Sequence, residues 1–328
     1  MKALNLHAIG DLRLEDLPTP VCEADEVLVK VEYCGICGSD IPRVFTKGTY
    51  HFPTVPGHEF AGTVVSDAEG KLTGKKVAIF PLLPCFKCKS CEEQHYAACS
   101  NYDYYGSRRD GGMAEYISVK RWNLLPLPEN VPTYIGAMCE PAAVARYASS
   151  KLGDIKGGSV LISGAGPIGA IAAQWCRHMG AKEVFFFDID DKKIDFIKSL
   201  GFSEYTDDIK VNFAIEGTGN GKALARCLNA LLPYGRITLM GNPSGDIALT
   251  QNDYWAILRK ELTLVGTWNS SYSDVRNDWA EAIKAISEGV ITLEPLISHK
   301  IPLDEYERAF NIMKNRTEFY NKVMLEVK

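Results

Sequence analysis

One segment, residues 159–188, constrains the fold of this chain more than any other. An apolar strand pattern over Ser159–Ser163 runs directly into a glycine-rich turn, and a helical pattern then continues from Ile168 to Met179. The turn has the spacing G-x-G-x-x-G, and its defining residues are Gly164, Gly166, Pro167, Ile168 and Gly169. Glycines at this spacing permit a close backbone approach to a pyrophosphate, which the N–H groups of the helix start attract. Strand, turn and helix together predict a dinucleotide-binding site, whereas the turn alone would also fit a sheet protein without ligand.

Asp188 indicates which dinucleotide to expect. It ends the next apolar strand, Val184–Asp188, at the distance expected of an acid that binds the ribose. A carboxylate there accepts hydrogen bonds from the ribose hydroxyls and repels a 2′-phosphate. Asp190 and Asp191 add negative charge where an NADP enzyme would prefer Arg or Lys. We therefore expect NAD rather than NADP.

The strand pattern changes along the chain, which indicates two kinds of domain. Short strands broken by Gly and Pro come first, at Glu26–Glu32, Phe60–Val65, Lys76–Phe80 and Ala114–Val119. Later strands of the buried type alternate with helices, at Ser159–Ser163, Val184–Asp188, Asn212–Glu216, Arg236–Met240 and Glu261–Thr267. A helix at Trp279–Ile286 and an apolar strand at Lys322–Val327 follow, and the strand could return to the first domain. The predicted fold class is α/β, with a β-rich domain and a doubly wound parallel sheet.

Four cysteines lie within fifteen residues, in the pattern C-x2-C-x2-C-x7-C. They are Cys85, Cys88, Cys91 and Cys99. Two-residue gaps bring successive sulfurs to one side of a tight turn, and four thiolates fill a tetrahedral zinc shell, so we predict a closed structural zinc site. The alternative is an iron–sulfur cluster, but the bacterial ferredoxin run continues with x3-C-P, whereas here the last gap is seven and Ser100 follows.

A second set of potential ligands lies earlier in the chain. Cys37 and His58 offer a thiolate and an imidazole, and either Glu59 or Glu140 supplies a carboxylate. This mixture suits a catalytic zinc that keeps one position open for water or substrate. Taken singly, Cys34 and Cys37 would also fit a redox pair, and His58 would fit a hydrogen-bonded core residue. Beside a nicotinamide site, however, a Lewis acid that lowers the pKa of an alcohol completes the requirements for alcohol oxidation.

Composition excludes several function classes. The chain of 328 residues is 46% hydrophobic and 23% charged, as expected for a soluble protein of about two domains. Its net charge of −5 and the absence of a basic stripe argue against binding to nucleic acid or an anionic membrane. Ten cysteines without a signal-peptide pattern indicate a reducing compartment, so we expect a cytoplasmic protein.

The motifs occur in an order that resembles zinc-dependent medium-chain alcohol and polyol dehydrogenases. The matching strings are Cys34-Gly-Ile-Cys37-Gly-Ser-Asp40, Gly57-His58-Glu59, the four-cysteine lobe, Glu140-Pro141 and Gly164–Gly169, and they span essentially the whole chain. The resemblance implies a GroES-like catalytic domain built from both chain ends, with a Rossmann domain inserted between them and catalysis in the cleft. On this basis we expect the catalytic domain at 1–143 and 270–328, with the zinc lobe at 85–99, and the NAD-binding domain at 144–269.

The resemblance also assigns roles by position. Cys37 and His58 match zinc ligands, Glu140 or Glu59 completes the shell, and each chain would hold one catalytic and one structural zinc. Ser39 matches the hydroxyl that passes the alcohol proton outward. This sequence departs from many relatives at Pro42, where they carry a relay histidine, so the proton must leave by another path.

Within that family, several segments are most similar to dehydrogenases of a sugar alcohol phosphate. They are residues 81–85, 105–112, 114–117 and 258–266. Arg108 and Arg109 form a natural fork for the phosphate, although an exposed turn or an internal salt bridge explains them equally well. A free polyol or L-threonine remains an alternative substrate. A zinc-ribbon binding module and a dehydrogenase-like scaffold without activity are the alternatives from other classes.

The assembly is the last expectation from the sequence. The apolar strand Glu261–Thr267 could pair across a two-fold axis, so we expect a homodimer or homotetramer. Apart from other copies of the chain, we expect a small-molecule substrate as the only partner.

Overall fold

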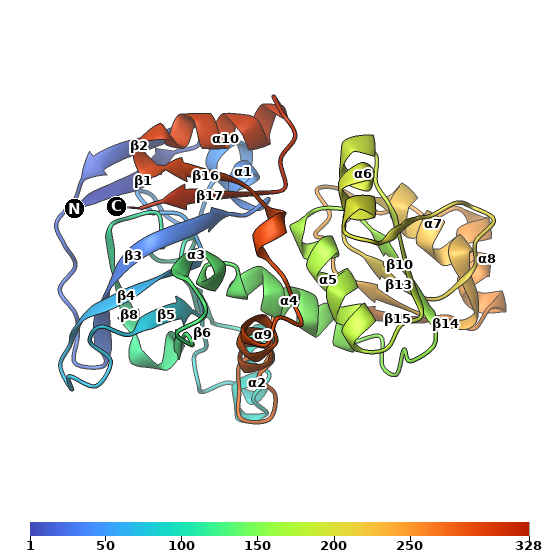
Figure 1. Cartoon of the computed structure of the whole chain (residues 1–328), viewed down its shortest axis with the longest axis horizontal. Helices are drawn as coiled ribbons and strands as arrows, with labels where there is room; N and C mark the ends of the chain where they lie inside the picture. Colours follow the sequence, from blue (N-terminus) through green and yellow to red (C-terminus); the bar gives the residue numbers. More distant parts are fainter. Residues whose placement is uncertain (328) are drawn as a thin grey trace. The chain divides into compact units, whose positions relative to one another are not determined.

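The computed structural model describes residues 1–327 and divides into two compact units. The first combines residues 1–140 with the described residues from 271 onward, and the second comprises residues 141–270. Both ends of the chain therefore build one unit, and the other is inserted between them (Figure 1). Among the described residues, every helix is too short or too polar to cross a bilayer.

The first unit is organised by a mixed seven-stranded sheet, within the described part of the chain. Its order is β16-β17-β3-β4-β5-β9, with β8 paired to β3. The strands are β3 (Glu26–Ile36), β4 (Glu59–Asp67), β5 (Lys76–Ile79), β8 (Tyr116–Lys120), β9 (Leu124–Pro126), β16 (Ile297–Pro302) and β17 (Lys322–Glu326). Figure 1 shows the late strand β17 beside β3, and the two pair antiparallel, with Val323 opposite Ile36. The prediction that the last strand returns to the first domain is confirmed.

Smaller elements surround this sheet. The further strands are β1 (Lys2–Ala8), β2 (Asp11–Asp16), β6 (Leu82–Leu83) and β7 (Asp103–Tyr104). The helices are α1 (Asp40–Pro42), α2 (Lys89–Glu92), α3 (Thr133–Gly136), α9 (Asp278–Ser287) and α10 (Tyr306–Asn315), with single turns at Arg43–Lys47, Tyr96–Ala98, Arg121–Asn123, Glu294–Leu296 and Leu303–Glu305. Helix α4 (Cys139–Ser150) begins in this unit and continues into the second.

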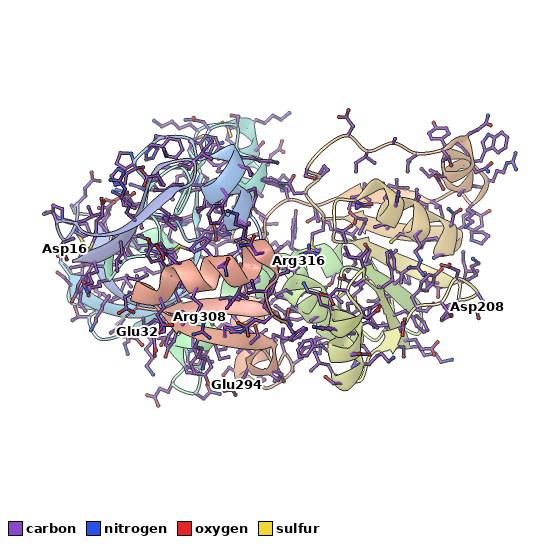
Figure 2. The ribbon with its side chains drawn as sticks, turned by 90° about the horizontal axis from the view of Figure 1, so that it is seen from above. Asp16, Glu32, Asp208, Glu294, Arg308 and Arg316 are labelled. Carbon is purple, nitrogen blue, oxygen red and sulfur yellow. The ribbon has the colours of Figure 1, made fainter. Side chains whose placement is uncertain are left out.

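Alternation along β3 explains why this strand lies at the centre of the first unit. Successive side chains of a strand point to opposite faces, and Val27, Val29 and Val31 are fully buried on one of them. On the other face Glu32, labelled in Figure 2, accepts hydrogen bonds of 2.6 Å from the hydroxyls of Thr63 and Thr133. One carboxylate thus ties β3 to β4 and to α3.

The second unit is a parallel six-stranded sheet in the order β12-β11-β10-β13-β14-β15. Its strands are β10 (Ser159–Ser163), β11 (Glu183–Phe187), β12 (Ser203–Glu204), β13 (Val211–Glu216), β14 (Leu231–Leu239) and β15 (Thr263–Gly266). Its helices are α5 (Pro167–His178), α6 (Asp191–Ser199), α7 (Gly221–Ala230) and α8 (Gln251–Arg259). In Figure 1, α5 and α6 lie on one side of the strands, and α7 and α8 lie on the other. The predicted doubly wound α/β fold is confirmed.

The predicted elements of this unit differ from the observed ones only at their ends. The helix expected at Ile168–Met179 begins one residue earlier, because the fixed φ of Pro167 suits the first helical position. The strand expected at Glu261–Thr267 is shorter. Glu261 has a φ of 50°, which is outside the extended region, so the strand starts only at Thr263.

Candidate functional site

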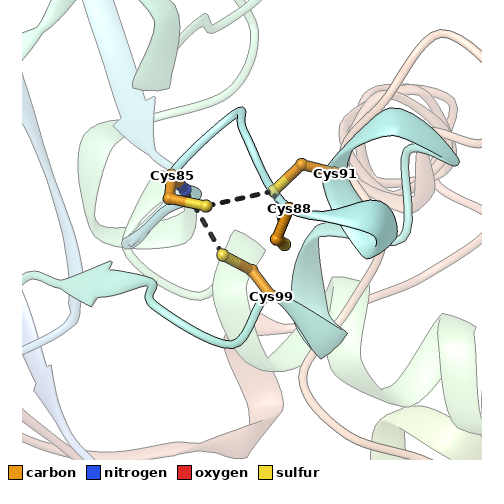
Figure 3. A group of neighbouring side chains, drawn as sticks. All are labelled: Cys85, Cys88, Cys91 and Cys99. Carbon is orange, nitrogen blue, oxygen red and sulfur yellow. Dashed lines mark hydrogen bonds between the residues drawn. The ribbon is translucent and has the colours of Figure 1, made fainter.

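The four-cysteine lobe lies between β6 and β7 and gathers its sulfurs into one group. The four sulfur atoms lie within 4.8 Å of one another, with Sγ–Sγ distances of 3.9 Å from Cys85 to Cys91 and 3.5 Å from Cys88 to Cys91 (Figure 3). All four thiols are free. Four sulfurs bound tetrahedrally to one zinc at the usual bond length stand about 3.8 Å apart, so this group fits the ion.

Local hydrogen bonds favour thiolates in this lobe. The backbone N–H groups of Ser100 and Cys91 lower the pKa of Cys88 to about 6. Burial instead raises the pKa of Cys91 to about 12, a penalty that a cation among the sulfurs would offset. The side chain of Gln94 fastens the lobe to the rest of the unit, because it accepts hydrogen bonds from the N–H groups of Asp274, at 3.0 Å, and Val275, at 3.3 Å.

A second group of potential ligands forms where β3 and β4 pair. Gly35 of β3 lies opposite Glu59 of β4, and this register brings Cys37, just beyond β3, to His58, just before β4. One ligand atom each from Cys37, His58 and Glu59 lies within 4.8 Å of the other two. A Cβ at position 35 would stand 2.4 Å from Oε2 of Glu59, so only glycine leaves room for this carboxylate.

Asp40 is a buried acid next to Cys37 and His58. It is fully buried, accepts a 2.9 Å hydrogen bond from the N–H of Cys37, and forms an ion pair with Arg43. Its Oδ1 lies 3.6 Å from Nδ1 of His58. Burial opposes its charge, but His58 and Arg43 lower the pKa of Asp40 to about 2. Asp40 is therefore an anion that fixes the segment at Cys37 and lies beside the imidazole of His58.

The imidazole of His58 shows that the group suits a cation. Its Nδ1 is buried and makes no hydrogen bond within the described chain. Burial opposes protonation, yet Asp40 and Cys37 raise the pKa of His58 well above its ordinary value. The negative charges of Asp40 and Cys37 thus favour a positive charge at this group. Thiolate, imidazole and carboxylate are zinc ligands, so the residues fit this metal.

Two further acids and bases complete the surroundings. Lys322, which begins β17, donates a hydrogen bond to Glu59 in a buried ion pair. Burial opposes its charge, but Glu59 and Cys37 raise the pKa of Lys322 above its ordinary value. Glu140 is 8% exposed, and burial raises its pKa to about 7. The hydroxyl of Tyr104 donates to Glu140 at 3.5 Å, and its ring centroid lies 5.8 Å from that of His58.

The glycine-rich turn of the second unit has the properties of an anion site. Gly164 has a φ of 97°, and a Cβ at Gly169 would stand 2.1 Å from the carbonyl oxygen of Gly164, so the turn requires both glycines. No atom lies within 4 Å of a Cβ built at Gly166, which leaves that side open. Helix α5 begins there without a side-chain cap, so its first N–H groups are available to an anion. The turn therefore fits a dinucleotide pyrophosphate.

Asp188 lies where the sequence predicts it, just after β11 and next to this turn. Its Oδ2 accepts a 2.8 Å hydrogen bond from the N–H of Ala165, and its Oδ1 accepts one of 3.0 Å from the N–H of Asp190. The carboxylate thus fixes the glycine-rich turn from the neighbouring strand. It is in position to meet a ribose bound over the turn.

One of the two arginines predicted to bind a phosphate, Arg108, already contacts neighbouring side chains. The guanidinium of Arg108 lies between the rings of Tyr50 and Tyr102, at 4.2 Å and 4.4 Å from their centroids. It also donates to the Tyr102 carbonyl oxygen at 3.0 Å and to the Tyr50 hydroxyl at 3.2 Å. Arg109 forms an internal ion pair with Asp103, at 3.6 Å, and its guanidinium lies over the ring of Tyr105, 5.1 Å from the centroid, but it is not held between two rings. The two arginines are therefore not equivalent.

Sequence reasoning placed Ser39 but missed three neighbours of the ligands. Ser39 is exposed, and its hydroxyl makes no capping hydrogen bond to α1. Asp40, Tyr104 and Lys322 were not predicted as site residues. A signal exists only for Asp40, which follows the ligand cysteine at the end of the quoted motif. Lys322 is separated from Glu59 by 263 residues, and local pattern does not detect such a contact.

Comparisons with known proteins agree with this geometry. The domain described as "Alcohol dehydrogenase GroES-like domain" matches residues 23–129, and "Zinc-binding dehydrogenase" matches residues 167–288. Galactitol 1-phosphate 5-dehydrogenase of Escherichia coli (strain K12) is 35% identical over 329 aligned residues, covering 94% of this chain and 95% of that protein. L-threonine 3-dehydrogenase of Proteus mirabilis (strain HI4320) is 29% identical, covering 96% and 97%.

A solved structure shows the same similarity in three dimensions. The crystal structure of galactitol-1-phosphate dehydrogenase from Escherichia coli superimposes with a TM-score of 0.92 and 34% identity, covering 99% of this chain and 100% of that one. The predicted combination of a GroES-like and a Rossmann domain is confirmed. Similarity that extends through both units at this level of identity shows that the chain belongs to the zinc-binding alcohol dehydrogenase family, as an NAD(P)-dependent dehydrogenase of alcohols or polyols.

Proposed function

We propose that this enzyme oxidises a secondary alcohol of a sugar alcohol phosphate, galactitol 1-phosphate or a close analogue, to the keto sugar phosphate, with hydride passing to NAD. The observation that carries the proposal is the group Cys37, His58 and Glu59, assembled in a chain similar over 94% of its length to a galactitol 1-phosphate 5-dehydrogenase. The ligand group accounts for alcohol oxidation, and the similarity accounts for the choice of alcohol.

Cys37, His58 and one carboxylate would hold the catalytic zinc, which would supply a Lewis acid for the alcohol oxygen. Asp40 orients the His58 imidazole and fixes the backbone at Cys37, as partners behind metal ligands do. The exposed hydroxyl of Ser39 lies two residues from Cys37 and takes up the alcohol proton. Because Pro42 replaces the relay histidine, the proton leaves Ser39 through water.

The carboxylate ligand is the choice between Glu59 and Glu140. Lys322 already holds Glu59 in a buried ion pair, whereas Glu140 has a single long hydrogen bond, from Tyr104, within the described chain. Glu140 lies outside the group of Cys37, His58 and Glu59 in this structure, so we propose that it approaches to complete the resting zinc shell and that Glu59 takes part in an exchange after substrate entry.

The acids after β11 support NAD rather than NADP. Asp188 is fixed at the glycine-rich turn, and Asp190 and Asp191 begin α6 directly after it. A 2′-phosphate would meet these three carboxylates.

A substrate panel tests the proposed function. NADH formation is followed with galactitol 1-phosphate, galactitol and L-threonine, and with NADP replacing NAD. We expect the highest kcat/KM with galactitol 1-phosphate and NAD, by at least about tenfold over galactitol, because a charge-assisted phosphate contact contributes this much. A higher kcat/KM with L-threonine would replace the proposal by the second candidate, which the similarity to L-threonine 3-dehydrogenase favours.

Arg109 is the arginine we assign to the substrate phosphate, because Arg108 is held between two tyrosines. Changing Arg109 to Ala should lower kcat/KM for galactitol 1-phosphate by about tenfold and leave that for galactitol within twofold. Arg108→Ala is the control, and it should lower thermal stability, because it removes both stacked contacts. Equal losses on both substrates in Arg109→Ala would refute the phosphate contact.

Paired cysteine variants separate the two metal sites. Cys37→Ala should lose one of two zinc ions, abolish turnover and leave NAD binding nearly unchanged, while the melting temperature falls less than in Cys88→Ala. Cys88→Ala should lose the other zinc and lower the melting temperature first, because it opens the four-cysteine lobe. Zinc content by atomic emission, calorimetry and turnover are measured on both. An active Cys37→Ala enzyme with full zinc content would overturn the assignment.

We also propose that two copies pair through β15, which is the edge strand of the parallel sheet and is not fully buried. Light scattering should give the mass of a dimer or tetramer, and Leu264→Lys in the middle of this strand should shift the protein toward monomer. A wild-type monomer at working concentration would contradict the proposal.

A further inference from the structure

A buried carboxylate stands at the end of β13, in the second unit. Glu216 is 4% exposed, and its side-chain contacts with the described residues are hydrogen bonds from uncharged donors. A buried charge without a counter-ion is unfavourable unless several hydrogen bonds satisfy it. The contacts of Glu216 therefore show what its charge is used for.

Donors from a single turn satisfy this carboxylate. Its Oε1 accepts hydrogen bonds from the N–H of Thr218, at 2.7 Å, and from the hydroxyl of the same residue. The N–H of Gly219 reaches both oxygens, at 3.0 Å and 3.1 Å, and the hydroxyl of Ser163, at the end of β10, lies at 3.4 Å. The backbone from residue 216 to 219 is thus wrapped around the Glu216 side chain.

This turn lies at the edge of the sheet where a ligand is expected. In the strand order β11-β10-β13, the chain leaves β10 for β11 on one side and later returns as β13 on the other. Ligands of such sheets bind outside the carboxyl ends of the strands at this reversal. Glu216 ends β13 there, directly beside the glycine-rich turn that follows β10.

Close packing presses the turn against its neighbours. A Cβ at Gly164 would stand 3.1 Å from Cγ2 of Thr218. On the far side, a Cβ at Gly241 would stand 1.9 Å from the nitrogen of Gly219 and 2.7 Å from Oε2 of Glu216. The turn therefore forms a wall between the glycine-rich turn and the segment after β14, and Glu216 is its internal support.

We propose that Glu216 is a positioning residue for the dinucleotide. It holds the turn 216–219 against Gly164 before the cofactor arrives, so the cofactor does not have to order this wall when it binds. The carboxylate itself does not touch the cofactor. The negative charge of Glu216 would repel a nearby pyrophosphate. Four hydrogen-bond donors face this charge and reduce the repulsion, so we expect the ordering of the turn to have the larger effect on cofactor binding.

The test is the variant Glu216→Gln, made in the full zinc-loaded chain. Glutamine has nearly the same shape, and its oxygen can take the donors that face Oε1, but the side chain loses its charge and its NH2 group cannot accept from the N–H of Gly219 that faces Oε2. The Kd for NAD, measured by calorimetry without alcohol, should rise about tenfold, since the hydrogen bonds that hold the turn lose their charge assistance and the second contact of Gly219 is lost. In turnover assays the KM for NAD should rise while kcat at saturating NAD and the KM for the alcohol stay near wild type.

A matched control separates positioning from general stability. Asp253 is also a buried carboxylate of this unit, 8% exposed, and caps α8 by accepting from the N–H of Thr250 at 3.0 Å and from Asn229 at 2.9 Å. Asp253→Asn should lower the melting temperature and leave the Kd for NAD within about twofold. Glu216→Gln, in contrast, should change the Kd for NAD as well as the melting temperature.

Two results would overturn the proposal. One is a Glu216→Gln protein with a lower melting temperature and the wild-type Kd for NAD, which would make Glu216 structural only. The other is tighter NAD binding, which would show that charge repulsion dominates. If Glu216→Gln does not fold, Thr218→Val removes a single hydroxyl donor and should weaken NAD binding about threefold. Wild-type affinity in that milder variant would equally refute the proposal.

Discussion

The antiparallel register of β3 and β4 is the constraint on which the rest of the candidate catalytic site depends. Because Gly35 lies opposite Glu59, the residues just beyond the paired ends, Cys37 and His58, meet in space. A slip of one residue would turn Glu59 to the opposite face and separate the thiol from the imidazole. Buried valines along β3 hold this register, since the same slip would expose all of them. Core packing and ligand geometry are therefore set by one pairing.

Charge is distributed very differently in the two ligand groups. The four-cysteine lobe is held by its own backbone, and only sulfur faces its centre. Around Cys37 the ligands are embedded in a network of buried ion pairs, with Asp40 against Arg43 and Glu59 against Lys322. Each buried ion needs its partner, because removal of one member leaves an uncompensated charge. The two groups therefore depend on different parts of the fold, one on its own backbone and the other on ion pairs with distant residues.

Local patterns sufficed to predict the elements that carry the chemistry. Apolar runs located β10 and β11, and the helical pattern from Ile168 located α5 within one residue of its observed start. The pairing of Lys322 with Glu59 could not be predicted, because it requires knowing which strands are neighbours. The stacking of Arg108 between tyrosines was equally hidden, since it depends on a loop meeting residue 50. Sequence therefore predicts ligand types and the presence of strands, while the exact strand ends and the partners across the fold depend on tertiary contacts.

The position of β17 has a consequence for how the enzyme matures. A ribosome delivers residues 85–99 as one continuous piece, so the sulfur lobe can close around its ion while translation is still under way. The other ligand group receives Lys322 only when the last strand emerges and docks on β3. The four-cysteine group is therefore local in the sequence, whereas the surroundings of Cys37 are complete only when the last strand is in place.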